Sequence, residues 1–538
     1  MPQRFILWLL YIVLFPWHVC YAQWKQETFI IGADFNPAPL SLSSGDSIQY
    51  VADVQAAKDA YINLFMGYTN TGRYLDSNYI QYQLQTIEKY GIRMLYKVTD
   101  NFTLKNADQV FNFCVGLDSI IGKILIGYNI QDEPRLSDLL NVNNWNVAIA
   151  QRDPQRLGYV NLLPIYGFQS RKEYENYLTE FLANPHDLNV SLGVVSYDFY
   201  PFVYGEMRPD YFYNLSIIRK MAGGRPFWFY VQSVQHSIYD DPTQYQLEFQ
   251  IFCPIAYGAK GYVFYTYETI PHSNNYTYGD AIISRNGTPS DKYAMISKIN
   301  RYVHDIAGPV VMNSDFLGVF HVSNQPFGQS LPSDEFVNAD MPVISQVSDQ
   351  NIFAGIFHSR LNKSEYNVIF VNKADKSLKN VPISIRGNHV GHIMFSRKLD
   401  DDVRTANFKF ISSTYDASSN LTRLVLDFAP GELRVLKVLN MDNAYEDVIY
   451  PKEFNVSVYP NPISSSARIV CSLSQSASVS IGIYGMDGRL RQLILPLTHL
   501  APGKYYLYFD KPKVETGFYI IALKANGKFR ASAKILLN

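Results

Sequence analysis

Eight short apolar or aromatic runs recur at nearly equal spacing in the first part of the chain, and this periodicity constrains the fold most. The runs start at Thr28, Tyr61, Ile92, Ile124, Tyr159, Ser191, Pro226 and Gly261. Successive starts are 31 to 35 positions apart by subtraction, which is room for one strand and one helix. Stretches with helical spacing lie between the runs, such as 78–90 and 171–182. Eight such units predict a (β/α)8 TIM barrel over residues 23–308. An open doubly wound sheet is the competing architecture, but no Gly-x-Gly-x-x-Gly follows the first strand.

Length and charge narrow the function classes. The chain has 538 residues, which is too long for one ordinary domain. Its 47 Lys and Arg nearly balance its 48 Asp and Glu, with a formal net charge of -1. This balance argues against a protein that binds nucleic acid by neutralising phosphates. The aromatic fraction of 15% leaves stacking on sugar rings open.

The carboxyl ends of the eight predicted strands carry polar side chains. Chemistry in a (β/α)8 barrel sits at these ends. The candidates are Asp34 and Asn36 after the first strand, Asp132 and Glu133 after the fourth, Asp198 and Tyr200 after the sixth, Gln232 at the seventh, and Tyr267 and Glu268 after the eighth. Carboxylates, amides and hydroxyls on one rim suit a sugar better than an apolar ligand or a phosphate. We expect six of them to bind a carbohydrate substrate: Asp34, Asn36, Asp132, Tyr200, Gln232 and Tyr267.

Glu133 is the best candidate for a general acid. Cleavage of a glycosidic bond needs one carboxylic acid to protonate the leaving oxygen and a second carboxylate as nucleophile or base. Glu133 closes the fourth strand, and Pro134 then ends that strand. The plainer alternative is that Asp132 or Glu133 caps the following helix.

A family resemblance enters at this motif. The stretch Asn129-Ile-Gln-Asp-Glu-Pro134 resembles the strand-four signature of retaining glycoside hydrolases with (β/α)8 barrels. The resemblance covers residues 28–305 and implies that Glu133 is the acid/base. Two positions depart from the family pattern. Asp132 replaces the Asn that touches the sugar, and Gln232 stands at the end of strand seven, where the family has its Glu nucleophile. An amide cannot attack an anomeric carbon as a carboxylate does.

Several residues could compensate for Gln232. Glu268 could supply the second carboxylate, or Asp198 could act as a base for water. Gln232 itself could orient a substrate N-acyl group or a water. Each of these roles has a plainer alternative. Asp198 could serve merely to anchor loops by hydrogen bonds, and Glu268 could be a charged residue on the rim with no part in catalysis. Tyr267 lies two positions after Tyr265, so both could share one face of the barrel wall. The barrel could also bind glycans without cleaving them.

Metal and cofactor chemistry is not expected. Cys114, Cys253 and Cys471 form no C-x-x-C pair and are predicted to be buried apolar residues. His236 and His272 lie near strand ends without the Asp or Glu spacing of a metal site, so each is expected to be solvated or hydrogen-bonded. The chain has no Gly-x-Ser-x-Gly elbow of a serine hydrolase.

The second half of the chain changes its periodicity from helical to strand-like. Residues 309–440 predict a β-sandwich, and 441–452 a linker. Residues 453–538 predict a compact, immunoglobulin-like β-sandwich with a tight hairpin at Asp487-Gly488. Its Tyr459-Pro-Asn-Pro462 motif, Asp487-Gly488-Arg489 turn and terminal Lys534-Ile-Leu-Leu-Asn538 closely resemble the C-terminal sorting domain of type IX secretion cargo in Bacteroidetes. This resemblance implies that the secretion machinery is a partner of residues 453–538.

The N-terminus predicts export. Arg4 precedes an apolar stretch, and residues 1–22 are typical of a cleaved signal peptide. With the sorting domain, this indicates a secreted or outer-surface protein. No later stretch has the length and hydropathy of a transmembrane helix, so none is expected in the mature chain.

Overall fold

The computed structural model describes most of the chain. The described residues are 24–37, 44–67, 77–98, 107–182, 192–270, 277–322, 343–399, 408–439, 454–459, 461–463, 466–473, 477–500, 503–512 and 514–538. The predicted signal peptide (1–22), the predicted linker (441–452) and His272 lie outside them.

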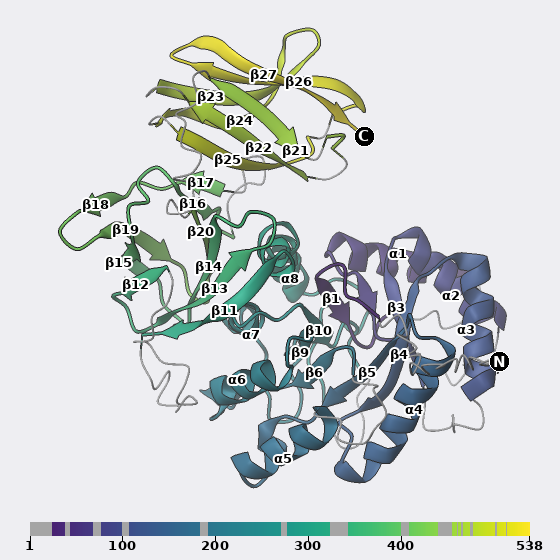
Figure 1. Cartoon of the computed structure of the whole chain (residues 1–538). Coiled ribbons are helices and arrows are strands. Elements are labelled where there is room, and N and C mark those ends of the chain that lie inside the picture. The colour runs from purple at the N-terminus through teal and green to yellow at the C-terminus, as the bar shows by residue number, and fades with distance from the viewer. Residues whose placement is uncertain are drawn as a thin grey trace, which may run out of the picture.

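The first part of the chain is a closed barrel of eight parallel strands (Figure 1). The strands are β1 (Ile30–Ala33), β2 (Leu64–Phe65), β3 (Arg93–Lys97), β4 (Leu125–Asp132), β5 (Leu157–Leu162), β6 (Val195–Asp198), β9 (Phe227–Gln232) and β10 (Gly261–Tyr265). Around the barrel the order is β1-β10-β9-β6-β5-β4-β3-β2. The (β/α)8 prediction is confirmed, and each predicted apolar run contains or adjoins one strand.

Helices follow the barrel strands and cover their outer side. They are α1 (Ser44–Asp59), α2 (Ser77–Lys89), α3 (Ala107–Ile121), α4 (Leu139–Arg152), α5 (Arg171–Leu182), α6 (Tyr211–Met221), α7 (Gln244–Ala256) and α8 (Asp291–Tyr302). The helices predicted at 78–90 and 171–182 correspond to α2 and α5. A short hairpin of β7 (Phe202–Val203) and β8 (Glu206–Met207) is inserted between β6 and α6. Its strands have only two residues each, too few for an alternation pattern to predict them.

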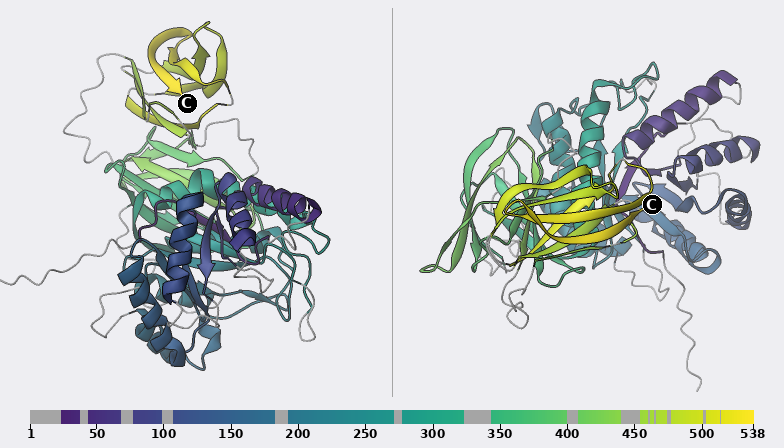
Figure 2. Two further views of the ribbon diagram at one scale, coloured as in Figure 1. Left: turned by 90° about the vertical axis from the view of Figure 1, so that its right-hand side faces the viewer. Right: turned by 90° about the horizontal axis from the view of Figure 1, so that it is seen from above.

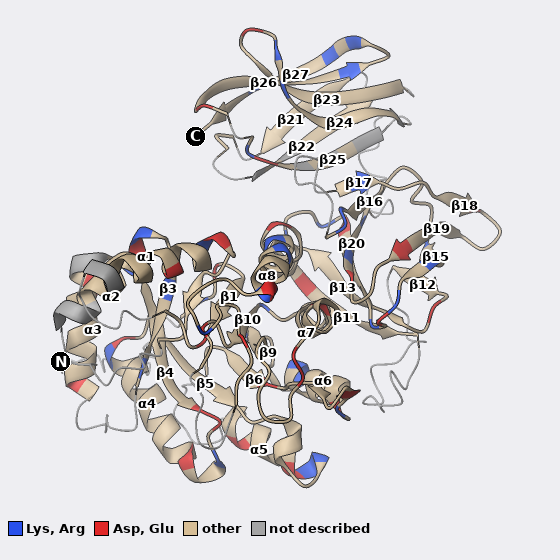
Figure 3. Ribbon diagram, turned by 180° about the vertical axis from the view of Figure 1, so that it is seen from behind, with Lys and Arg blue, Asp and Glu red and all other residues tan. Residues whose placement is uncertain are grey.

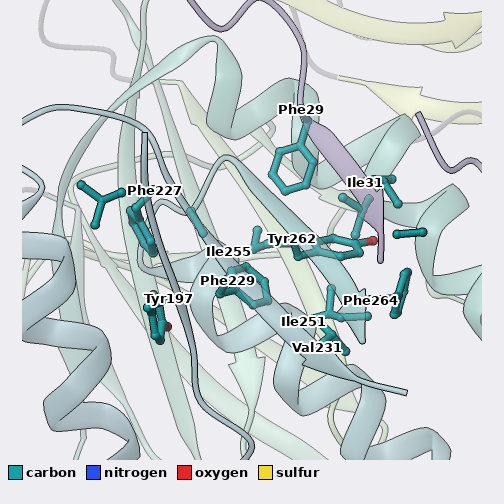
Figure 4. Packing of buried hydrophobic residues seen from close by; sticks show 14 of the residues in the cluster. Phe29, Ile31, Tyr197, Phe227, Phe229, Val231, Ile251, Ile255, Tyr262 and Phe264 are labelled. Carbon is teal, nitrogen blue, oxygen red and sulfur yellow. The ribbon is translucent and has the colours of Figure 1, made fainter. Parts of the chain in front are cut away.

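Side chains alternate between two cores along each barrel strand. The core inside the barrel includes Leu157, Tyr159, Trp228, Tyr230 and Val263. The other core lies between the strands and the helices. Figure 4 shows part of it, where Phe227, Phe229 and Val231 of β9 lie near Ile251 and Ile255 of α7. Because the inward positions are two residues apart, the last inward residue of each strand reaches the open end of the barrel.

A π-helical turn (Val303–Ala307) and α9 (Gly308–Met312) connect the barrel to a β-sandwich. One sheet has the order β11-β13-β14-β20-β16-β17 and the other β12-β15-β19-β18. Their strands are β11 (Ser314–His321), β12 (Ile344–Val347), β13 (Ile352–Ser359), β14 (Glu365–Asn372), β15 (Leu378–Arg386), β16 (Ile393–Ser396), β17 (Phe408–Phe410), β18 (Thr414–Asp416), β19 (Leu421–Phe428) and β20 (Leu433–Leu439). At Gly355 of β13 the two backbones meet so closely that an added Cβ would lie 1.8 Å from the carbonyl oxygen of Ala256 in α7. The sandwich is therefore packed tightly against the barrel.

The last strands form a second, smaller sandwich. It pairs a sheet of order β21-β22-β25 with one of order β24-β23-β26-β27. The strands are β21 (Asn455–Tyr459), β22 (Ser466–Leu473), β23 (Ala477–Gly485), β24 (Leu490–Leu500), β25 (Gly503–Asp510), β26 (Gly517–Ala525) and β27 (Lys528–Leu537). The predicted hairpin at Asp487-Gly488 joins β23 to β24. This sandwich stands on the first one (Figure 2), where the ring of Tyr505 lies 5.1 Å from that of Phe410 and 6.3 Å from that of His392.

The charged side chains are mixed in sign, and the cysteines are buried. Lys and Arg are interspersed with Asp and Glu along the barrel helices (Figure 3). Cys114, Cys253 and Cys471 are buried free thiols, which confirms their prediction as apolar residues. Every helix in the described parts of the chain is too short or too polar to cross a membrane.

Candidate active site

The open end of the barrel gathers polar side chains from several strands. Strand register pairs Asp132 with Asn161 across β4 and β5, and Asn161 with Ser196 across β5 and β6. Asp198 is paired with Tyr230, a residue of the inner core. The alternation of strands therefore turns Asn161, Ser196 and Asp198 inward, above the apolar side chains that fill the barrel.

Glu133 and Asp198 form a hydrogen-bonded carboxyl pair at this end. Asp198 is only 6% exposed, whereas Glu133 lies exposed on the rim above it. Burial, followed by the charges of Glu133 and Asp132, raises the pKa of Asp198 well above its usual value. Burial and Asp132 also raise the pKa of Glu133. Two carboxyls in contact cannot both ionise easily, so they titrate as one coupled unit in which the buried Asp198 is the harder to ionise.

Neutral side chains hydrogen-bond to the carboxyls at this end of the barrel. The amide nitrogen of Asn161 donates to Asp132 at 3.1 Å and to Asp198 at 3.4 Å. The amide oxygen of Asn161 accepts from the hydroxyl of Ser196 at 3.0 Å, and Ser196 is bonded to the hydroxyl of Tyr159 at 2.7 Å. This chain of hydrogen bonds fixes which side of Asn161 faces the carboxyls.

A third inward carboxyl lies at the end of β1. The carboxylate of Asp34 accepts from the backbone N–H of Phe35 at 2.8 Å and from the hydroxyl of Tyr230 at 3.4 Å. Burial and the nearby charge of Asp132 raise the pKa of Asp34 to about 6, against the opposing effect of Lys97. Lys97, the last residue of β3, also opposes the rise in the pKa of Asp132. Asp34 is therefore mostly ionised at neutral pH, balanced by a nearby cation.

The backbone at Glu133 excludes the capping alternative. Glu133 has φ of 45°, a left-handed conformation that is unusual for a residue with a Cβ. Its N–H donates to the carbonyl of Asn161 at 2.8 Å. Arg135 occupies the N-cap position of the next helical turn (Leu136–Asp138), and Asp138 that of α4. Neither Asp132 nor Glu133 caps a helix, so that alternative is wrong. Strained backbone that positions a polar side chain is typical of functional sites.

An aromatic wall borders the carboxyl pair on the β6, β9 and β10 side. We define this wall as Tyr200, His236, Tyr239, Tyr265 and Tyr278. His236 is its centre, with ring distances of 4.7 Å to Tyr239, 5.2 Å to Tyr265 and 5.7 Å to Tyr278. The ring of Tyr200 lies 5.3 Å from that of Tyr239, and Asp198 is close enough to raise the pKa of Tyr200. Aromatic faces beside carboxyls suit the C–H faces and hydroxyls of a sugar.

His236 is hydrogen-bonded within the loop that follows β9. Its Nδ1 lies 3.1 Å from the carbonyl of Val234, which fits the expected hydrogen-bonded histidine, and burial lowers its pKa. Among the described residues, no group of three His, Cys, Asp or Glu side chains is placed to hold a metal ion.

Gln232 is built into the scaffold rather than presented to a ligand. It is 0% exposed, and its amide nitrogen donates to the carbonyl of Val234 at 3.0 Å and to the carbonyl of Asp240. Its backbone N–H donates to the side chain of Gln250 in α7 at 3.0 Å. Both amide hydrogens thus hold the loop between β9 and α7. From the sequence we expected Gln232 to contact the substrate, but its amide is bonded within the scaffold instead. An amide at this position can donate to two carbonyls, which a carboxylate could not do.

Restoring the carboxylate of the family pattern should therefore destabilise the fold. Gln232→Glu removes both donors and leaves two buried carbonyls facing a carboxyl group. We expect a loss of about 3 kcal/mol in the free energy of unfolding, measured by denaturant titration. Gln151→Glu, the same change at an exposed position of α4, is the comparison and should change stability by less than about 0.5 kcal/mol. Unchanged stability of Gln232→Glu would contradict the assigned bonds.

Three other expected residues make contacts within the scaffold. Tyr267 is fully buried in the core between strands and helices, with its hydroxyl donating to the carbonyl of Asp53 at 3.2 Å. It does not share a face with Tyr265, because β10 ends at Tyr265 and strand alternation ends with it. Glu268 lies near Asp53 of α1, and burial and that charge raise its pKa to about 8. Asn36 is buried, and its amide donates to the carbonyl of Pro37 at 3.2 Å. Glu268 is thus not the partner of Glu133.

Sequence reasoning missed Lys97, Asn161 and Tyr159. Each side chain points into the barrel, because it lies two or four residues along its strand from an apolar residue of the inner core. Asp34, Asp132, Glu133, Asp198 and Tyr200 were expected at the site, and the structure brings them together.

Comparisons with known proteins give fold-level likeness only. No protein-family model matches the chain, and no curated protein matches it. Among solved structures, the chain is similar to a maltogenic alpha-amylase from Thermotoga neapolitana, with 9% identity over 77% of this chain and 98% of that one and a TM-score of 0.43. It is similar to a GH39 enzyme from Xanthomonas axonopodis pv. citri, with 10% identity, coverage of 77% and 94% and a TM-score of 0.37. A cycloisomaltooligosaccharide glucanotransferase from Paenibacillus sp. shows 6% identity, coverage of 76% and 85% and a TM-score of 0.47. Overlaps this loose do not identify an activity, so the functional argument rests on the site.

Proposed function

We propose that this protein is a glycoside hydrolase that uses Glu133 as its proton donor and Asp198 as the partner carboxyl. The observation that carries the proposal is the contact between these two carboxyls, one buried and one exposed, at the open end of the barrel. Glycoside cleavage needs one carboxyl that is protonated near neutral pH and another that is ionised. Burial of one member and exposure of the other supply this difference.

The reaction follows from where the two groups lie. Glu133 is exposed and meets the glycosidic oxygen, while the buried Asp198 keeps the proton and passes it to Glu133 across their hydrogen bond. The proton goes to the leaving oxygen as the bond from that oxygen to the anomeric carbon breaks. The ionised carboxylates of Asp34 and Asp198 stabilise the positive charge that develops on the sugar. A water then adds to the anomeric carbon and returns its proton to the carboxyl pair.

The contact between the two carboxyls sets a condition on turnover. Retaining enzymes hold their carboxyls about 5–5.5 Å apart and inverting enzymes about 6.5–9.5 Å apart, whereas Glu133 and Asp198 are hydrogen-bonded to each other. A substrate must therefore displace the side chain of Glu133 from Asp198. Because Glu133 is exposed on the rim and Asp198 is buried, Glu133 is the side chain with room to move outward.

The test is reducing-end release from a panel of soluble poly- and oligosaccharides. Proton NMR of the first-formed anomer then shows whether the configuration is retained or inverted. No release from any member of a broad panel would contradict the proposal. That result would favour a glycan-binding barrel, the candidate that the missing carboxylate at Gln232 supports.

We also propose that the protein is exported and displayed or released outside the cell, with residues 453–538 as the sorting signal. The support is the motif set of that segment and its folding as a separate sandwich core. Deleting 453–538 in a host with type IX secretion should hold the chain in the periplasm. Unchanged export of the truncated chain would contradict the assignment.

A further inference from the structure

The β7–β8 hairpin carries an exposed tyrosine on an unfavourable turn. Tyr204 and Gly205 are the two residues of the turn, and both have positive φ, 54° and 80°. A two-residue turn of this kind favours Asn-Gly, because a side chain with a Cβ is strained at the first position. Tyr204 is nevertheless there, and it is 77% exposed. A large aromatic ring that is strained without being buried points to a function outside the fold.

Several hydrogen bonds hold this hairpin in place. The N–H of Gly205 donates to both carboxylate oxygens of Asp240, at 3.0 and 3.1 Å. The N–H of Asp240 donates to the carbonyl of Phe202 at 3.3 Å. The carbonyl of Asp240 in turn accepts from the buried amide of Gln232. Gln232, at the strand end where related barrels carry a nucleophile, thus anchors the loop that positions Tyr204.

The hairpin adjoins the aromatic wall. Val203, the residue before Tyr204, forms a β-bridge with Tyr239 of the wall. The guanidinium of Arg208, just after the hairpin, lies 5.4 Å from the ring centre of Tyr239 and 4.2 Å from that of Tyr166. Asp198 is close enough to raise the pKa of Tyr166. The hairpin that carries Tyr204 is therefore held beside the aromatic wall, whose Tyr200 adjoins Asp198 of the carboxyl pair.

We infer that Tyr204 is an outer stacking subsite for a glycan chain that extends from the Glu133–Asp198 pair along the aromatic wall. This rests on the proposed function and deepens it: the substrate is an oligo- or polysaccharide rather than a single glycoside. We expect the glycan to be uncharged. Asp34, Asp132 and the carboxyl pair outnumber the cations Lys97 and Arg208 near this path, and the excess of negative charge repels uronate or sulfate groups.

The test compares two substitutions at Tyr204 in a Glu133→Gln background, so that the probe is not consumed. The probes are starch, dextran, xylan and a β-1,3-glucan, each cast into native gels, with alginate as the anionic comparison. Tyr204→Asn removes the ring and suits the turn; Tyr204→Phe keeps the ring. We expect Tyr204→Asn to weaken retardation by a neutral polysaccharide about 3–10-fold without lowering the melting temperature. Tyr204→Phe should behave as the parent, and alginate should retard none of the proteins.

Equal retardation of Tyr204→Asn and the parent would overturn the inference, as would retardation by alginate or a parent that no polysaccharide retards. These results are separate from a failure of the proposed function. If the wild-type protein releases reducing ends from short oligosaccharides, the Glu133–Asp198 assignment holds even if substitutions at Tyr204 have no effect.

Discussion

Replacing Glu133 by glutamine is expected to lower kcat about 10²–10⁴-fold on whichever glycan the wild type cleaves, because a positioned general acid contributes that much. Asp198→Asn should cause a loss of the same order, since an amide cannot supply or hold the shared proton. The double variant should be scarcely worse than either single one, because two residues that act as one unit are not additive. Steady-state kinetics of the three variants measure this.

Glu268→Gln is the matched control. It makes the same chemical change at a carboxyl that sequence reasoning could not distinguish from Asp198, but that the structure places near Asp53 of α1. Its kcat should equal that of the wild type. Thermal melts of all variants separate lost catalysis from lost folding. Full activity in Glu133→Gln, or additive losses in the double variant, would show that the two carboxyls do not form one acid–base unit.

The same Glu268→Gln change should stabilise the protein at alkaline pH. The pKa of Glu268 is raised from 4.5 to about 8 in the folded state, so the fold disfavours the ionised form. The cost is absent below pH 4.5, grows as the pH rises, and is complete above pH 8. Removing the charge should raise the free energy of unfolding by about 2–4 kcal/mol at pH 8.5, since a tenfold change in an ionisation equilibrium corresponds to about 1.4 kcal/mol.

Denaturant titrations of wild type and Glu268→Gln at pH 4.5, 6.5 and 8.5 follow this dependence. Glu180→Gln on the exposed side of α5 is the comparison, and it should change stability by less than about 0.5 kcal/mol at every pH. A stability difference for Glu268→Gln that does not grow with pH would contradict the placement of this side chain.

The regular spacing of apolar runs was enough to predict the barrel. Each strand of a parallel barrel is buried on both faces, so it appears in the sequence as a short apolar run, and each return helix has a similar length. The β7–β8 hairpin was not predicted from the sequence, because its strands are too short to show an alternation of apolar and polar residues. Its turn also carries Tyr204 where turn chemistry would suggest asparagine.

At the site, alternation along the strands decides which residues meet. Asp198 ends β6 on the inward parity, so its position followed from the strand itself. Tyr267 and Glu268 come after the end of β10, where the path of the chain and not a two-residue period sets the direction of a side chain. Counting every second residue from the inner-core positions of β3 and β5 would have identified Lys97 and Asn161 as inward-facing residues. The role of Gln232 depends on Val234 and Asp240, contacts within a loop that no local pattern predicts.

Carboxyl-carbon NMR titration of protein labelled in Asp and Glu tests the shared proton most directly and needs no substrate. Signals are assigned by their loss in Glu133→Gln and Asp198→Asn. We expect Asp198 to ionise at a higher pH than Glu133 and the signals of both residues to move together in coupled steps. Two independent transitions near pH 4, with both carboxyls ionised at pH 7, would contradict it.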